Sequence, residues 1–380
     1  MSDEGTTGPT EPPLDAAAAF VPPTPAEREA RLAACSRSLL GNGRRSPDEI
    51  TAEVAEVLGD VTPDRYGSGG VVAELEAEMC EILGKPAAVF MPSGTMAQQI
   101  AMRVHADRLG RRTVLWHPTA HPEKHEDQAA VRLHGLTGRP VGDPEQLITL
   151  SDLEDVAEYA GVLLLELPQR EIGGQLPSWD DLVAQTSLAR SHGTVLHLDG
   201  ARLWECVPHY GRSEAEISSL FDSVYVSFYK GLGGVAGCAL AGDEQLVDEA
   251  REWRHRHGGT LFHMWPLAAP ALAGARLRRP RMTSYVEHAR AIAALLSDVD
   301  GVELVPDPPV TNMFHLYLRV EPGAFAAAAK RFADEDDLYV WPTSYYTVRP
   351  RWQAVELSVG DATLQFTPTE VRDVIAALLG

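Results

Sequence analysis

An alternation of short apolar strands with helices between residues 87 and 227 restricts the possible folds of this chain more than any other feature. Apolar runs of strand length occupy residues 87–92, 112–116, 161–167, 194–199 and 223–227. Stretches with helical spacing, such as 96–106 and 179–192, lie between them. Such alternation requires crossover connections, so we predict an α/β fold with a mostly parallel sheet that helices cover on both faces.

The length of 380 residues predicts a large domain with a smaller partner. Residues 1–25 are rich in Pro, Thr and acidic residues and lack the features of a secretion signal, so we expect a disordered tail. Residues 26–265 form the expected large domain, with an N-terminal segment that includes helices at 26–34 and 47–58. Near Pro266 the pattern changes to two helices, sparse strands and a closing helix, so we expect residues 266–380 to form the smaller α/β domain.

Charge and cysteine content limit the possible partners of this chain. The formal net charge is −21, and the basic face that nucleic acid would require is missing. No apolar run approaches the length that crosses a bilayer, so we expect no membrane span. The four cysteines are widely spaced without a CxxC pair, which fits a reducing cytoplasm.

Lys230 follows an apolar strand directly and precedes the small-residue stretch Gly231 to Gly237. A buried lysine amine has a lowered pKa and becomes a nucleophile toward a carbonyl group. The glycines would let a flat ring approach the backbone, and Ser227 could donate to a phosphate. Taken alone, the motif fits a solvated turn lysine as well.

Two further motifs follow predicted strands. Asp199 stands at a strand end with Arg202 three residues later, so its carboxylate could pair with a cationic ring nitrogen or form a structural pair with the arginine. Ser93, Gly94 and Thr95 stand at the start of a helix, where backbone amides bind phosphate or where the residues serve as an ordinary cap. Because sites in open parallel sheets lie beyond the carboxyl ends of the strands, we expect these residues to converge.

Taken together, these motifs resemble the low-specificity threonine aldolases, which belong to the β-eliminating lyase group of pyridoxal-phosphate enzymes. The resemblance covers about residues 66 to 273. The matching elements, in order, are Tyr66-Gly67, Leu75-Glu76, Gly84-Lys85, Ser93 to Met96, Ala120-His121 with Glu126, Gly173-Gly174, His197 to Arg202, Ser227 to Gly237 and Gly258-Gly259.

The resemblance implies a fold of the aspartate-aminotransferase type (fold type I), an amino-acid substrate and a role for each motif. Lys230 is expected to hold pyridoxal phosphate as a Schiff base, Asp199 to pair with the ring nitrogen, and Arg202 to bind the substrate carboxylate. His121 is expected to stack on the ring and to assist the proton of the substrate hydroxyl. Ser93, Gly94, Thr95 and Ser227 are the expected phosphate ligands. The family also implies a homodimer or homotetramer.

Three segments depart from the family pattern. Tyr66 is followed by Gly-Ser-Gly-Gly, and Leu261-Phe-His263 stands where the family has a cation that His263 replaces only in part. The family has a second arginine near its C-terminus that binds the substrate carboxylate. At that place this chain has the segment around Glu356, whose negative charge would repel the substrate carboxylate. Arg349, Arg351 and Arg37 are candidates for that second grip.

We therefore expect retro-aldol cleavage of a β-hydroxy-α-amino acid to glycine and an aldehyde. β-Elimination, racemisation or transamination on the same scaffold stays open, as does a cofactor-free protein that keeps the fold. His117, His121 and His125 recur every four residues, an interval that lines up metal ligands on a helix. Pro118 and Pro122 interrupt the stretch, so we expect no continuous helix and no metal site there.

Overall fold

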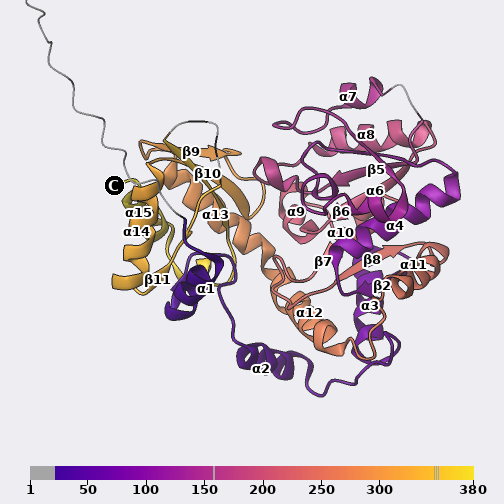
Figure 1. The fold of residues 1–380 in the computed structure, drawn as a ribbon, viewed down its shortest axis with the longest axis horizontal. Helices are drawn as coiled ribbons and strands as arrows, with labels where there is room; N and C mark the ends of the chain where they lie inside the picture. Colours follow the sequence, from indigo (N-terminus) through magenta and orange to yellow (C-terminus); the bar gives the residue numbers. More distant parts are fainter. Residues whose placement is uncertain (1–21, 157–158, 346, 348, 350) are drawn as a thin grey trace, which may run out of the picture.

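The computed structural model describes residues 22–156, 159–345, 347, 349 and 351–380, and its main body is a seven-stranded sheet (Figure 1). The strand order is β2-β8-β7-β6-β5-β3-β4. Strand β8 runs antiparallel to both of its neighbours, and the other neighbouring pairs are parallel. The strands are β2 (Ala87–Met91), β3 (Thr113–Trp116), β4 (Thr137–Pro140), β5 (Val162–Glu166), β6 (Val195–Gly200), β7 (Ser223–Ser227) and β8 (Cys238–Gly242). The predicted mostly parallel α/β sheet is confirmed.

Helices cover both faces of this sheet, so its central strands are buried. Every residue of β7 and of β8 is buried. The helices of this part are α3 (Gly70–Leu83), α4 (Gly94–Leu109), α5 (His121–Lys124), α6 (Ala129–His134), α7 (Leu150–Glu154), α8 (Trp179–Ser191), α9 (Leu203–Tyr210), α10 (Glu214–Ser218) and α11 (Glu244–Arg256).

Capping residues set the start of the first two helices. Helix α1 (Pro25–Ala34) begins after Thr24 and helix α2 (Pro47–Leu58) begins after Ser46. In each case the hydroxyl accepts a hydrogen bond from the backbone N–H of a glutamate three residues later, whose side chain bonds back to the cap. Both predicted helices are confirmed, whereas most of the expected disordered tail, residues 1–21, lies outside the described residues.

The C-terminal part contains a second, smaller sheet. Strands β9 (Val302–Val305), β10 (Met313–Arg319) and β12 (Trp352–Ser358) pair antiparallel, with β10 in the middle. The helices of this part are α13 (Met282–Leu296), α14 (Pro322–Glu335) and α15 (Pro368–Leu378). The smaller C-terminal α/β part is therefore present as expected.

Several contacts cross the expected boundary between residues 26–265 and 266–380. Strand β1 (Arg37–Ser38) pairs in parallel with β11 (Leu338–Tyr339), so the N-terminal segment lies against the C-terminal part (Figure 1). In the other direction, helix α12 (Trp265–Arg278) packs against α2 and α3. The division at residue 265 stays a prediction.

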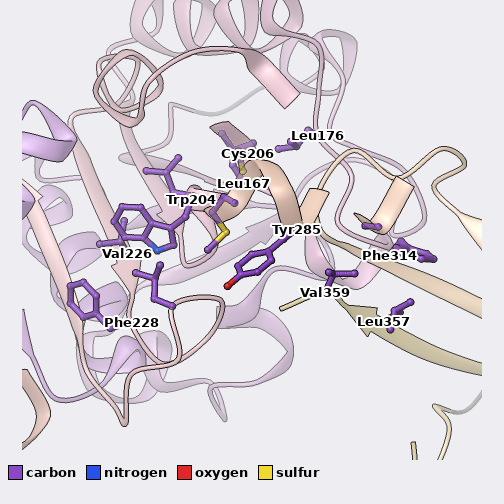
Figure 2. Packing of buried hydrophobic residues seen from close by; sticks show 14 of the residues in the cluster. Leu167, Leu176, Trp204, Cys206, Val226, Phe228, Tyr285, Phe314, Leu357 and Val359 are labelled. Carbon is purple, nitrogen blue, oxygen red and sulfur yellow. The ribbon is translucent and has the colours of Figure 1, made fainter. Parts of the chain in front are cut away.

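One hydrophobic core runs through both parts of the molecule. Figure 2 shows Trp204 and Val226 of the large sheet region, Tyr285 of α13, and Leu357 and Val359 of the C-terminal sheet region. All five side chains belong to the same buried cluster. The two parts therefore share apolar surface, which fixes the C-terminal sheet beside the large sheet.

Asp64 joins the segment before α3 to the start of α12. Its buried carboxylate accepts hydrogen bonds from the backbone N–H groups of Gly67, Met264 and Trp265 at 2.8, 2.7 and 2.8 Å. Two of these donors lie at the N-terminus of α12, where a negative charge is favourable. His263, expected to replace a family cation in part, instead bonds the Asp64 backbone carbonyl through Nδ1.

We predict that Asp64→Ala lowers the free energy of unfolding by about 3 kcal/mol, because three backbone donors lose a charged acceptor. Urea denaturation followed by circular dichroism measures this change. The control is Asp48→Ala at an exposed position on α2, which should shift stability by less than about 0.5 kcal/mol. Equal effects of the two substitutions would contradict the role given to Asp64.

Candidate active site

Four of the expected site residues meet in one pocket beyond the carboxyl ends of β5, β6 and β7, whereas Ser93, Gly94, Thr95 and Ser227 do not line it. Lys230, Asp199, Arg202 and His121 all line it, together with Glu166 and Arg170, which the sequence analysis did not select. Strands β5, β6 and β7 are parallel neighbours, so residues that follow them reach the same edge of the sheet.

Lys230 lies three residues after the end of β7 and is half-buried. Burial lowers the pKa of its amine, while the Asp199 carboxylate acts in the opposite direction. The next residue must be glycine, because a Cβ at Gly231 would lie 2.6 Å from Oε1 of Glu205. This local packing leaves the lysine amine facing carboxylates in a confined pocket, which favours nucleophilic chemistry.

Asp199 is a buried carboxylate on β6, and it accepts a hydrogen bond from the Ala201 N–H at 3.1 Å. Burial raises its pKa, and the positive charges of Lys230 and His121 partly offset this shift. A cationic group beside Asp199 would therefore stabilise its ionised form.

His121 opens the short helix α5 and shares a hydrogen bond between its Nδ1 and Oε1 of Glu126 at 2.9 Å. This bond raises the pKa of His121 against the effect of burial, and burial raises the pKa of Glu126. When the ring is neutral, an Nδ1–H donated to Glu126 leaves Nε2 as the nitrogen that can accept a proton.

Ser93, Gly94 and Thr95 lie at the N-terminus of α4, where the Ser93 side chain makes no capping hydrogen bond. Cys238 connects this turn to the end of β7, because it lies opposite Ser227 and its thiol donates to the Ser93 carbonyl at 3.3 Å. The Ser227 hydroxyl is buried and has no hydrogen-bond partner of normal geometry among the described residues. Gly94 fits closely, since a Cβ there would overlap the Tyr225 hydroxyl.

Arg202 is held by two carboxylates. Its Nη1 donates to Glu205 at 3.1 Å, and its Nη2 lies 3.5 Å from Oε1 of Glu356. Burial acts to lower the pKa of Arg202, but Glu205 and Glu356 raise it above the ordinary arginine value. The guanidinium is therefore charged at every pH at which the protein is folded.

The three arginines considered for the second carboxylate grip each pair elsewhere. Arg349 pairs with Glu303, Arg351 pairs with Glu321 at 2.9 Å, and Arg37 stacks on the Phe366 ring at 4.3 Å. The arginine that the structure does bring to the pocket is Arg170, at the start of a short 3₁₀ helix (Arg170–Ile172) after β5. Its Nε lies 2.8 Å from Oε2 of Glu356.

The three histidines at four-residue intervals take different partners. His117 bonds the Thr119 hydroxyl and the Gln146 carbonyl, and His125 bonds Glu171 at 3.0 Å. As expected from the prolines, they do not share a continuous helix, since α5 covers only His121–Lys124. Within the described part of the chain, no three His, Cys, Asp or Glu side chains group as metal ligands. In that part no helix is long and apolar enough to span a bilayer.

Comparison with known proteins gives the family. The family model described as beta-eliminating lyase matches residues 48–320 of this chain. The chain belongs to this family. Aldolase vrtJ of Penicillium aethiopicum is 34% identical over 289 residues, which cover 72% of this chain and 71% of the relative. The low specificity L-threonine aldolase of Escherichia coli K12 is 29% identical and is covered over 82% of its length.

Solved structures agree with this membership. A Listeria monocytogenes protein assigned to the L-allo-threonine aldolases has a TM-score of 0.87 and 39% identity, covering 93% of this chain and 98% of that one. An Exiguobacterium protein assigned to the aromatic amino acid beta-eliminating lyases or threonine aldolases has a TM-score of 0.86 and 36% identity. The resemblance inferred from the motifs is confirmed, and with it the fold type of this beta-eliminating lyase.

Glu166 is a buried acidic residue of the pocket that the sequence analysis did not select as a site residue. It ends β5 directly opposite Asp199 on β6 and accepts hydrogen bonds from the backbone N–H groups of His121 and Arg170. Burial and the like charge of Asp199 raise its pKa to about 7. The rule that selected Asp199, a carboxylate at a strand end, would also have selected Glu166.

The raised pKa of Glu166 predicts a pH-dependent stability difference. Between about pH 5 and 7 the folded protein keeps a proton that the unfolded chain has lost, so this stabilisation disappears as the pH rises through 7. Glu166→Gln has no such proton to lose. We predict that the free energy of unfolding of this variant, relative to that of the unsubstituted cofactor-free protein, is higher at pH 8 than at pH 5. Urea denaturation at both pH values measures the difference. The exposed substitution Glu56→Gln should show a constant difference, and a constant difference for Glu166→Gln would refute the assignment.

Proposed function

We propose that this chain is a pyridoxal-phosphate-dependent lyase that cleaves a β-hydroxy-α-amino acid into glycine and an aldehyde. The observation that carries the proposal is the convergence of Lys230, Asp199, Arg202 and His121 in one pocket of a beta-eliminating lyase. Aldolases among its relatives, including the Escherichia coli threonine aldolase, support the reaction class.

The residues around the pocket fit pyridoxal phosphate. Lys230 would hold it covalently, the Asp199 carboxylate would pair with its ring nitrogen, and His121 would lie on its ring. The Ser227 hydroxyl, buried without a hydrogen-bond partner of normal geometry among the described residues, fits the phosphate group. The N-terminus of α4 with Ser93, Gly94 and Thr95 adds unpaired backbone donors on the same side. When bound, the cofactor supplies an electron sink for the bond broken at the α-carbon.

The side chains of Arg202 and His121 determine which bond of the substrate breaks. Arg202 binds the substrate carboxylate and fixes the rotation about the α-carbon. His121, with Glu126 on its Nδ1, accepts the proton of the β-hydroxyl through Nε2, which allows the bond between the α- and β-carbons to open. β-Elimination, racemisation and transamination do not form glycine together with an aldehyde.

We also propose that the enzyme works in the cytoplasm as a homodimer or homotetramer. The four cysteines are all free, which suits a reducing compartment. Tyr66 and Phe262 are half-exposed aromatic rings in edge-to-face contact, with 5.2 Å between the ring centroids, and Trp265 is also exposed. Aromatic side chains gathered in this way are typical of subunit interfaces.

Product analysis tests the reaction directly. We predict that the enzyme loaded with cofactor releases glycine and an aldehyde from threonine, allo-threonine or phenylserine, and that Lys230→Ala loses the visible absorbance band and turnover. The control is Lys124→Ala, an exposed lysine on α5, which should keep both. An intact absorbance band in Lys230→Ala would remove the role of Lys230, and a band without aldehyde would move the enzyme to another amino-acid reaction.

Gly94 provides a separate test of the cofactor site. We predict that Gly94→Ala weakens binding of pyridoxal phosphate at least about tenfold, because the new Cβ meets the Tyr225 hydroxyl and displaces the start of α4. Titration of the cofactor-free protein, followed by absorbance, measures the affinity. Gly323→Ala is the matched control, since nothing lies within 4 Å of a Cβ there. Unchanged affinity in Gly94→Ala would argue against a phosphate site at α4.

A further inference from the structure

Glu356 presents a problem for the proposed function, because it puts a negative charge beside the arginine that should bind the substrate carboxylate. We propose that Glu356 is the counter-ion of Arg202 in the substrate-free enzyme and that Arg170 holds it away from Arg202 when the substrate carboxylate binds. This inference rests on the proposed function for the identity of the substrate. Arg170 and Glu356 are then positioning residues that control access to Arg202.

The two contacts of Glu356 are unequal. Its Oε2 lies 2.8 Å from Nε of Arg170, whereas its Oε1 lies 3.5 Å from Nη2 of Arg202. Burial acts to raise the pKa of Glu356, but Arg202 and Arg170 together hold the pKa below its ordinary value. The carboxylate is thus ionised and lies nearer to Arg170, with which it forms an ion pair without hydrogen-bond geometry, while its contact with Arg202 is a long hydrogen bond.

Arg202 has donors to spare for an incoming carboxylate. Its Nε–H is buried without a hydrogen-bond partner among the described residues, and the contact of Nη2 with Glu356 is long. A guanidinium offers five N–H groups in a planar fork, which suits two carboxylate oxygens. The side chain lines the same pocket as Lys230 and Asp199, so the fork faces the substrate site.

A substrate carboxylate can bind Arg202 only if one of the carboxylates that pair with Arg202 moves away. Glu205, Glu356 and Glu171 already pair with Arg202 and Arg170, so a substrate carboxylate at Arg202 would add a further negative charge in a buried place. Glu205 is completely buried and packed against Gly231, so it cannot leave. Glu356 can move, because Arg170 offers it a closer partner.

Arg170 is itself anchored from two sides. Its Nη1 donates to Glu171 at 2.8 Å and its Nη2 donates to the Tyr345 hydroxyl at 3.1 Å. Ser358 donates to Glu356 at 3.3 Å from the same strand. The contacts with Glu171 and Tyr345 keep Arg170 in place while Glu356 shifts, so the carboxylate that moves away from Arg202 stays paired.

The experiment measures binding of glycine and of glycinamide, which lacks the carboxylate, to the enzyme loaded with cofactor by isothermal titration calorimetry. We expect Glu356→Gln to bind glycine roughly tenfold more tightly, because a competing charge is gone. Arg170→Gln should bind glycine roughly tenfold more weakly, because Glu356 then stays on Arg202. The double variant should recover the affinity of the unsubstituted enzyme or exceed it, and glycinamide binding should stay within about twofold throughout.

Two controls separate this inference from simpler ones. Arg170→Lys keeps the charge and should bind glycine nearly as well as the unsubstituted enzyme. Glu303→Gln and Arg349→Gln remove an exposed ion pair between glutamate and arginine, and they should leave the affinity for glycine unchanged.

Each contrary result has a definite meaning. A double variant as weak as Arg170→Gln would overturn the inference, because Arg170 would then bind the carboxylate itself. Parallel losses for glycine and glycinamide would overturn it as well, since they indicate general damage to the pocket. The enzyme could show the expected glycine and glycinamide affinities and yet release no aldehyde. That result would support the role of Glu356 and refute the aldol reaction.

Discussion

The buried side chain of Arg278 is the interaction on which the arrangement of the site depends. Its guanidinium pairs with Glu53 of α2 at 2.6 Å and with Asp361 at 2.9 Å, just after the end of β12. It also donates to the backbone carbonyl of Leu232 at 3.4 Å, two residues after Lys230. One side chain thus links the N-terminal segment, the lysine loop and the C-terminal sheet.

This linkage matters because the charged residues around Arg202 come from different parts of the chain. Lys230 and Arg202 belong to the large sheet, whereas Glu356 belongs to the C-terminal sheet. Tyr285 reinforces the connection, since its ring lies in the shared core (Figure 2). Its hydroxyl donates a hydrogen bond to the Asp361 carboxylate. Distances of about 3 Å between residues of the two sheets can be maintained only if neither sheet shifts relative to the other.

The sequence was sufficient for the features that follow from local patterns. Strand ends in a parallel sheet meet at one edge, so the convergence of Lys230 with Asp199 could be predicted, and the same rule would have found Glu166. The pairing of Arg170 with Glu356 could not be predicted, because 186 residues separate them and charged residues in loops carry no periodic signal. Strand β8 was not among the predicted strands, because its sequence consists largely of Ala and Gly, which are depleted in strands.

The pairing of β1 with β11 has a consequence for how the protein is made. Residues 37–38 leave the ribosome long before their partners at 338–339 are synthesised. A contact between such distant residues forms late and slowly, because a long loop must close first. The large sheet, whose strands lie between residues 87 and 242, can therefore assemble during synthesis. The C-terminal strand that carries Glu356 joins Arg202 only after the large sheet has been synthesised.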